Sequence, residues 1–106
     1  MNSSRLKYLQ ELLSENPNDP FVHYGIAIEY MENEPARCSE LLKNTAEKFP
    51  DYLPVYFTLG NLLYENEDYA SALTLVKIGI DLAKTQNNPK AQKELEQLKL
   101  NIEFEI

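Results

Sequence analysis

The stretch FTLGNLLYENEDYASAL, residues 57 to 73, places Gly60 inside an apolar pattern that has helical spacing. A polar break, ENED, follows it, and a second apolar pattern begins at Ala72. A glycine inside a helix costs about 1 kcal/mol relative to alanine, so at such a position it commonly marks a place where another element packs closely on the backbone. The stretch therefore predicts two helices joined by a short turn, with a close contact at Gly60.

A second copy of this pattern lies upstream. ENPNDPFVHYGIAIEY, residues 15–30, aligns with KFPDYLPVYFTLGNLL, residues 48–63, at an offset of 33. The small residues that the two copies pair are Ala27 with Gly60, Cys38 with Ala72, and Thr45 with Gly79. Self-similarity at a period of this size is typical of repeat architectures, in which each repeat packs against its neighbours. The sequence therefore predicts two helical hairpins in tandem.

One further helical pattern flanks the two copies on each side. The C-terminal one carries apolar residues at spacings of four and three, with Lys and Glu elsewhere. A polar outer face over an apolar inner face is what a terminal helix of a repeat stack requires. We therefore expect one domain over residues 1–106. Its parts are an N-terminal capping helix at 4–15, a first repeat at 17–50, a second repeat at 51–86 and a C-terminal capping helix at 89–104.

The two copies resemble the tetratricopeptide repeat (TPR) family, whose signature over about 34 residues is an aromatic residue, Leu-Gly, a Tyr, an Ala, a Phe and a closing Pro. The matching residues are Tyr56-x2-Leu59-Gly60 with Ala72 and Gly79 in the second copy, and His23-x2-Ile26-Ala27-x2-Tyr30 with Pro50 in the first. The chain departs from the signature in having no Trp, Leu63 in place of Tyr and Val76 in place of Phe.

The resemblance implies an all-α fold, a right-handed superhelical stack of about six antiparallel helices. It also implies that certain small residues lie where paired helices approach most closely. These repeat-packing residues are Ala27, Gly60, Ala72 and Gly79.

A second apolar stripe runs along the first helix of each copy. With 3.6 residues per turn, the stripe of the first copy lies about 130° away from the core face. The resemblance implies that this side lines a concave groove in which TPR proteins bind partner segments. The candidate partner-binding residues are Phe21, Tyr24, Ile28 and Met31 in the first copy, and Phe57, Asn61, Tyr64 and Glu65 in the second.

Three uses of the stripe stay open, namely a groove for a partner, the seam of a homodimer, and burial under the C-terminal helix. Residues 20–32 and 53–65 contain no Lys or Arg but do contain Glu29, Glu32 and Glu65. An aromatic and acidic groove favours a ligand that mixes apolar and basic residues. The acidic tails of chaperones, which other TPR proteins clamp with Lys, Asn and Arg, are not expected as ligands.

Composition makes other classes of function improbable. The formal net charge is −7, and the ten Lys and Arg residues form no run, so neither a nucleic-acid site nor an anionic membrane surface is expected. No apolar stretch approaches the length of a membrane span, and the N-terminus lacks the apolar core of a signal peptide, so we expect a cytoplasmic protein.

Nothing in the sequence predicts catalysis, a metal or a cofactor. Cys38 is the only cysteine and His23 the only histidine, and both lie on apolar sides of predicted helices. Each is therefore interpreted as a packed residue rather than a nucleophile or a base. The sequence predicts a non-enzymatic protein-interaction module, with a structural homo-oligomer as the alternative.

Overall fold

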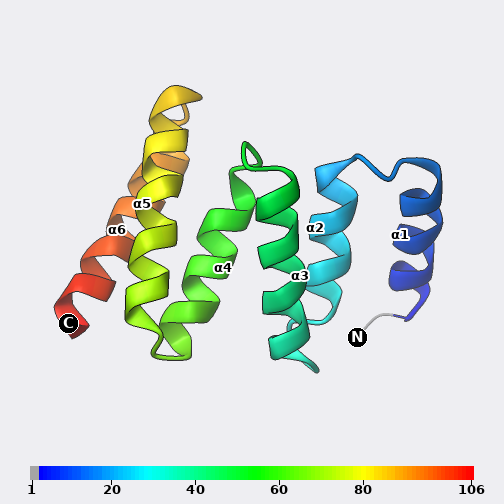
Figure 1. Cartoon of the computed structure of the whole chain (residues 1–106), viewed down its shortest axis with the longest axis horizontal. Helices are drawn as coiled ribbons and strands as arrows, with labels where there is room; N and C mark the ends of the chain where they lie inside the picture. The colour runs from blue at the N-terminus through cyan, green and yellow to red at the C-terminus, as the bar shows by residue number, and fades with distance from the viewer. Residues whose placement is uncertain (1–2) are drawn as a thin grey trace. The chain divides into compact units, whose positions relative to one another are not determined.

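The computed structural model describes residues 3–106, which form six α-helices and no strand (Figure 1). This confirms the predicted all-α fold class. The two flanking helices begin and end within one residue of the predicted positions. The helices are α1 (Ser3–Glu15), α2 (Pro20–Glu29), α3 (Pro35–Lys48), α4 (Pro54–Glu65), α5 (Tyr69–Thr85) and α6 (Pro89–Glu105).

The helix starts follow from local chemistry. Four helices, α2, α3, α4 and α6, have proline in the first turn, where its missing N–H would have no helical partner in any case. Three have a side-chain cap, in which an Asp or Asn oxygen accepts a backbone N–H of the first turn. The capping pairs are Asp19 with Phe21 (3.0 Å), Asp68 with Ser71 (3.3 Å) and Asn88 with Ala91 (3.1 Å).

The chain divides into two compact units, residues 1–50 (unit 1) and 51–106 (unit 2), and each is described by itself. In unit 1, α2 packs against both α1 and α3. Thr45 is buried in α3, and its hydroxyl is satisfied because Oγ1 donates a hydrogen bond of 2.8 Å to the Leu41 carbonyl. The buried apolar residues of unit 1 are Leu9, Val22, Ala27, Tyr30, Cys38 and Leu42.

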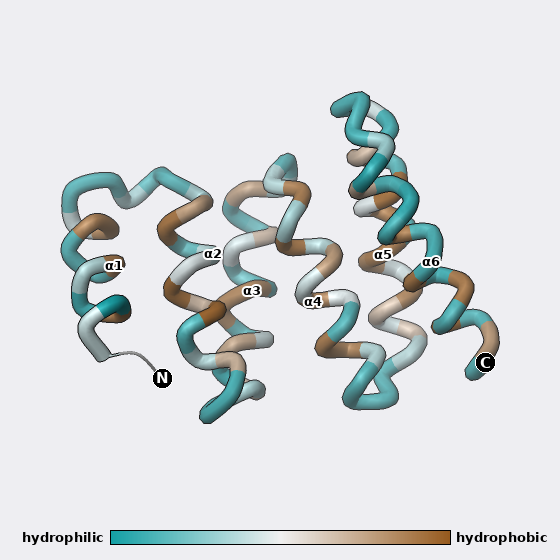
Figure 2. The backbone as a smooth tube through the Cα atoms, turned by 180° about the vertical axis from the view of Figure 1, so that it is seen from behind, coloured by the Kyte–Doolittle hydropathy of each residue, from teal (hydrophilic) through white to brown (hydrophobic). Residues whose placement is uncertain are grey.

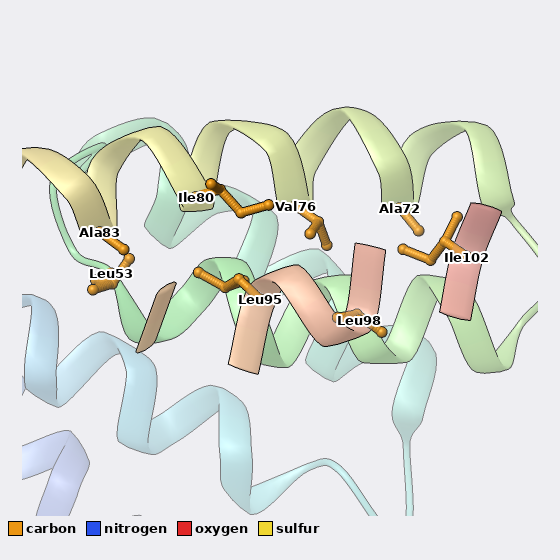
Figure 3. Close-up of a cluster of buried hydrophobic side chains, with 8 residues drawn as sticks. All are labelled: Leu53, Ala72, Val76, Ile80, Ala83, Leu95, Leu98 and Ile102. Atoms are coloured by element: carbon orange, nitrogen blue, oxygen red, sulfur yellow. The ribbon is translucent and has the colours of Figure 1, made fainter. Parts of the chain in front are cut away.

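In unit 2, α5 packs against both α4 and α6, and α4 also contacts α6. The core side chains of α5 point toward those of α6 (Figure 3). Burying one leucine completely contributes about 1.5–3 kcal/mol, so this cluster supplies much of the stability of unit 2. The cluster consists of Leu53, Ala72, Val76, Ile80, Ala83, Leu95, Leu98 and Ile102.

Hydrophobic and hydrophilic segments alternate along the helices, which is typical of amphipathic helices with one buried side (Figure 2). The expectation of a polar outer face on α6 is wrong at two positions, because Leu100 is 61% and Phe104 88% exposed. Within residues 3–106, no helix is both long and apolar enough to cross a lipid bilayer.

The two units close their hairpins in the same way. In unit 1, Lys48 Nζ at the end of α3 donates a hydrogen bond of 3.3 Å to the carbonyl of Pro17, before α2. In unit 2, Gln86 Nε2 after α5 donates a bond of 2.8 Å to the carbonyl of Asp51, before α4. The end of each second helix is therefore tied to the loop that precedes the first.

Candidate partner-binding site

Helix α2 has two covered sides. One side carries Ala27 into the core of unit 1. The other faces α1, where a Cβ atom added at Gly25 would lie 3.3 Å from Leu9 Cδ2. Arg5 of α1 also reaches this side and forms a salt bridge of 3.3 Å with Glu29. Because residues of a helix are spaced by 100°, the side that remains is the one on which the candidate stripe lies.

The four stripe residues of unit 1 differ in exposure. Phe21, in the first turn of α2, is 63% exposed, whereas Tyr24 and Ile28 are half-buried. Met31 is also half-buried and lies in the turn after α2, where its N–H donates to the Ile28 carbonyl at 3.0 Å. Phe21 is therefore the side chain of this stripe with the most apolar surface available to a ligand.

The corresponding residues of α4 in unit 2 are less available. Phe57 and Tyr64 are half-buried and pack against the unit 2 core cluster, and the Tyr64 ring lies 5.9 Å from that of Tyr69. The expectation that these two lie away from the core is therefore wrong. It failed because α6 packs on the neighbouring side of α4, at Gly60. Asn61 is half-buried and Glu65 exposed.

The charge of the α2 face also differs from expectation. The Glu29 side chain is only 8% exposed and is paired with Arg5, so it is not the free acidic group that the sequence suggested. On the same helix hairpin, the guanidinium of Arg37 lies 4.6 Å from the centre of the Tyr30 ring. Glu32 is exposed, just beyond α2. Of Glu29 and Glu32, only Glu32 is thus an exposed carboxylate.

The single histidine holds a loop in place. His23 is half-buried, its ring centre lies 5.2 Å from that of Phe49, and its Nε2 is 2.7 Å from the Pro17 carbonyl. A carbonyl oxygen can only accept, so Nε2 carries the proton and donates it. The same carbonyl accepts from Lys48, which gives the oxygen two donors. These contacts give His23 a structural use at the base of the α2–α3 hairpin.

The surroundings of the lone cysteine do not favour reactivity. Cys38 is fully buried, and burial raises the pKa of its thiol above the ordinary value, which disfavours the nucleophilic thiolate. Among the described residues, no group of three or more His, Cys, Asp or Glu side chains is placed to hold a metal ion.

The two repeat-packing glycines of unit 2 lie at contacts of three helices. A Cβ atom at Gly60 of α4 would lie 2.8 Å from Val76 Cγ2 of α5 and 3.3 Å from Leu98 Cδ2 of α6. A Cβ at Gly79 of α5 would lie 2.8 Å from Tyr56 Cβ and 3.2 Å from Leu95 Cδ1. Real Cβ atoms are essentially never found that close to a neighbour, so the backbones pass one another where only glycine fits. Ala27 and Ala72 are fully buried.

Sequence reasoning missed two features of the surface. The Arg5–Glu29 pair gave no local signal, because its partners belong to different helices. The exposed Leu100 and Phe104 did give a local signal, because two apolar residues four apart lie on the same side of a helix. That side is opposite the residues that form the inner stripe of α6.

Comparison with known proteins places this geometry in a family. A crystal structure of a tetratricopeptide repeat domain protein from Salinibacter ruber is 30% identical and superposes with a TM-score of 0.76, covering 80% of this chain and 96% of that one. A solution NMR structure of a tetratricopeptide repeat domain protein from the same organism is also 30% identical. Its TM-score is 0.77, and the match covers 83% of this chain and 90% of that one.

The TPR2B domain of yeast Sti1, in a complex with pHsp70, has a TM-score of 0.83 at 19% identity, over 95% of this chain and 82% of that one. At that identity the likeness concerns the fold alone. No protein-family model and no curated protein matches the sequence. From its fold and its likeness to the Salinibacter structures, the chain belongs to the tetratricopeptide repeat family.

Proposed function

We propose that this chain is a non-enzymatic protein-interaction module that binds a peptide or protein segment on the stripe side of α2. The observation that carries the proposal is the exposure of Phe21, 63%, at the head of a stripe whose other members are half-buried. An aromatic side chain set beside a partly covered apolar surface is the kind of residue that dominates binding energy at protein interfaces.

The class of ligand follows from family and charge. The yeast Sti1 domain, which shares the fold, is in a complex with pHsp70, and this supports a protein or peptide as the ligand. The stripe offers apolar and aromatic side chains, with the exposed Glu32 shortly after α2 in the chain and no Lys or Arg on α2 itself. A segment with an apolar anchor followed by a Lys or Arg fits this surface, because the cation finds a carboxylate at its edge.

The aligned residues of α4 in unit 2 form a second candidate surface, which we consider by itself. Asn61 and Glu65 supply a hydrogen-bonding amide and an exposed carboxylate for a ligand. Phe57 and Tyr64 contribute only the edges that their packing against the core leaves accessible. Loss of either should therefore affect stability as well as binding, which makes the α2 residues the cleaner probes of recognition.

The experiment that tests this proposal is a selection from a displayed peptide library, followed by calorimetric titration of the best binder. We expect sequences that combine aromatic or aliphatic residues with Lys or Arg. Phe21→Ala and Tyr24→Ala should each weaken the selected peptide by about 1–3 kcal/mol. The matched control is Tyr8→Ala, because Tyr8 is an exposed aromatic residue of unit 1, 60% exposed, that lies on α1.

Three results would contradict the proposal. The first is equal affinity of wild type and Phe21→Ala for every selected peptide. The second is a selection dominated by acidic peptides. The third is a wild-type dimer that Phe21→Ala dissociates while no peptide is selected, because the stripe would then be the seam of a homodimer.

A further inference from the structure

The side of α2 that faces α1 combines three kinds of chemical group. Glu29 lies on this side, and its carboxylate, only 8% exposed, pairs with Arg5 of α1. Gly25 lies one turn earlier, and a Cβ atom there would be 3.3 Å from Leu9 Cδ2. Val22, three residues before Gly25, shares the side and is 3% exposed. We call these three residues of α2 the α2 seat: an apolar side chain, a gap where a Cβ would be, and a largely buried carboxylate.

The contacts of α1 define what the α2 seat accepts. Leu9 of α1 lies against Gly25, and Arg5, four residues earlier, pairs with a residue four positions later in α2, Glu29. The two helices are therefore antiparallel, as Figure 1 shows, and the same register brings Leu12 level with the apolar residue of the seat. A buried carboxylate needs a cation, and a gap in a packed interface needs a side chain that fills it. The seat thus specifies a helix with the pattern Arg-x3-Leu-x2-Leu.

Helix α1 is held on the seat by few buried groups. Of residues 3–15, Leu9 alone is buried, whereas α6 buries Leu95, Leu98 and Ile102. An isolated helix of 13 residues has little stability in water, so the docked contacts are what keep α1 folded. Release of α1 is therefore a local opening of low free energy, of the kind that binding elements commonly use.

The base of the α2–α3 hairpin is closed by contacts that do not involve α1. The carbonyl of Pro17 accepts hydrogen bonds from His23 Nε2 at 2.7 Å and from Lys48 Nζ at 3.3 Å. Asp19 caps the first turn of α2 with its side chain. The chain is thus anchored to the hairpin from Pro17 onward, so α1 can leave the seat by rotation about the backbone at Asn16 while the hairpin stays closed.

We propose that the α2 seat is a docking site for an amphipathic helix of a partner protein with the pattern Arg-x3-Leu-x2-Leu, and that α1 is an exchangeable cover of this site. Such a helix, with anchors three and four residues apart, matches a common mode of peptide recognition. The short linker, residues 16–19, keeps α1 at an effective concentration on the order of millimolar, so a partner helix binds only if it is tighter than α1 or if α1 is loosened. The proposal does not rest on the proposed function, because the stripe includes no residue of the seat.

The probe is a fluorescein-labelled peptide of residues 3–15, titrated into the full chain and followed by anisotropy. Arg5→Glu in the chain loosens the cover and should tighten peptide binding by about threefold or more, because the apparent dissociation constant falls as the open fraction rises. Arg5→Glu in the peptide, tested against that same chain, should weaken binding by about threefold or more, because Glu29 then faces a carboxylate. Lys7→Glu is the matched control, the same charge change at an exposed position of α1, and should stay within about twofold in the chain and in the peptide.

A second pair of variants locates the site. Leu9→Ala in the chain should tighten peptide binding by about tenfold or more, because it removes the buried side chain of the cover. Gly25→Leu added to this variant should abolish the gain, because the new side chain fills the gap that receives Leu9 of the peptide. Asn44→Leu, the same new side chain at an exposed position of α3, should leave the gain intact. Amide hydrogen exchange of Leu9→Ala should show reduced protection in α1 and unchanged protection in α2 and α3.

Several results would overturn the proposal. One is a peptide that neither Arg5→Glu nor Leu9→Ala in the chain binds more tightly than wild type does. Another is a peptide that Arg5→Glu and Lys7→Glu weaken alike, because the seat would then make no specific ion pair. Loss of protection throughout α2 and α3 in Leu9→Ala would show that α1 belongs to the core and is not a cover. A wild-type dimer that excess peptide dissociates in sedimentation would assign the seat to α1 of a second copy and not to a partner protein.

Discussion

The tripeptide Glu-Asn-Glu occurs at the same place in both repeats, as residues 32–34 and 65–67, and adopts two different conformations. In unit 1, Glu34 has a φ of −139°, whereas in unit 2 the aligned Glu67 has a φ of 62°. The left-handed conformation of Glu67 is one that residues other than glycine rarely adopt. Identical residues at aligned positions thus adopt different backbone conformations between the two helices of each repeat.

The residue that follows accounts for the difference. Pro35 follows Glu34, and a proline restricts the residue before it to the extended region. Asp68 follows Glu67 and keeps its N–H, which donates a bond of 2.9 Å to the Leu63 carbonyl and closes α4. The conformation of a turn residue is therefore set by its neighbour in the sequence as much as by its own identity.

A second difference concerns the small residues. Unit 2 has glycine at two of the aligned positions, whereas unit 1 has Ala27 and Thr45 there. The glycines admit three helices to one contact, since Gly60 and Gly79 each approach side chains of both other helices of unit 2. Of the buried hydrophobic side chains among residues 3–106, eleven lie in unit 2 and six in unit 1, so we expect the larger mutational effects in unit 2.

The largest effect should come from Gly79→Leu, at about 3 kcal/mol of lost unfolding free energy. The new Cβ would meet Tyr56 Cβ, an atom fixed to the backbone of α4, so the helices must move apart. Gly60→Leu should cost less, about 2 kcal/mol, because the atom it meets first is a side-chain end, Val76 Cγ2. Urea denaturation measures both. Lys77→Leu, at an exposed position of α5, is the control and should change stability by under about 0.5 kcal/mol.

Equal costs for Gly79→Leu and Lys77→Leu would contradict the close approach at Gly79. If Gly60→Leu cost more than Gly79→Leu, our premise that Tyr56 Cβ yields less readily than Val76 Cγ2 would be wrong.

The features that sequence could predict are those that depend on residues near one another in the chain. The six helices follow from apolar spacing and from the prolines at four of their starts. The close packing at Gly60 follows from the repeat. The pairing of Arg5 with Glu29 and the packing of Phe57 against the core depend instead on which helix lies beside which, and single-helix periodicity does not contain that information.

Asp68→Pro should convert the α4–α5 turn toward the form seen in unit 1, at a cost of about 2 kcal/mol. The change removes the N–H bonded to the Leu63 carbonyl and the carboxylate that caps α5 at Ser71. It also forces Glu67 out of the left-handed region. Thermal unfolding followed by circular dichroism measures the loss. Asp68→Asn, which keeps the cap and the N–H, should stay within about 0.5 kcal/mol of wild type. A proline variant as stable as wild type would show that the turn accepts either conformation.

Arg5→Ala should destabilise unit 1 by about 0.5–1 kcal/mol, because it leaves the largely buried Glu29 carboxylate without its partner while Arg5 itself is 66% exposed. Alkylation of Cys38 offers a local readout. The buried thiol reacts only when unit 1 opens, so the rate should rise by about two- to fivefold in the variant. Lys7→Ala, exposed on the same helix, is the control. An unchanged alkylation rate in Arg5→Ala would mean that the pair contributes nothing to holding α1 on α2.

The smallest effect should be a gain in stability. Glu67→Gly places the residue best suited to a φ of 62° at the end of α4, and relief of the left-handed strain outweighs the entropy of the added glycine by about 0.5–1 kcal/mol. Glu34→Gly, the identical substitution at the aligned position of unit 1, should destabilise by about 0.5 kcal/mol, because a φ of −139° suits any residue and glycine only adds freedom to the unfolded chain. Urea midpoints of the two variants should therefore shift in opposite directions. Shifts of the same sign would contradict the role that we assign to the different backbone conformations of Glu34 and Glu67.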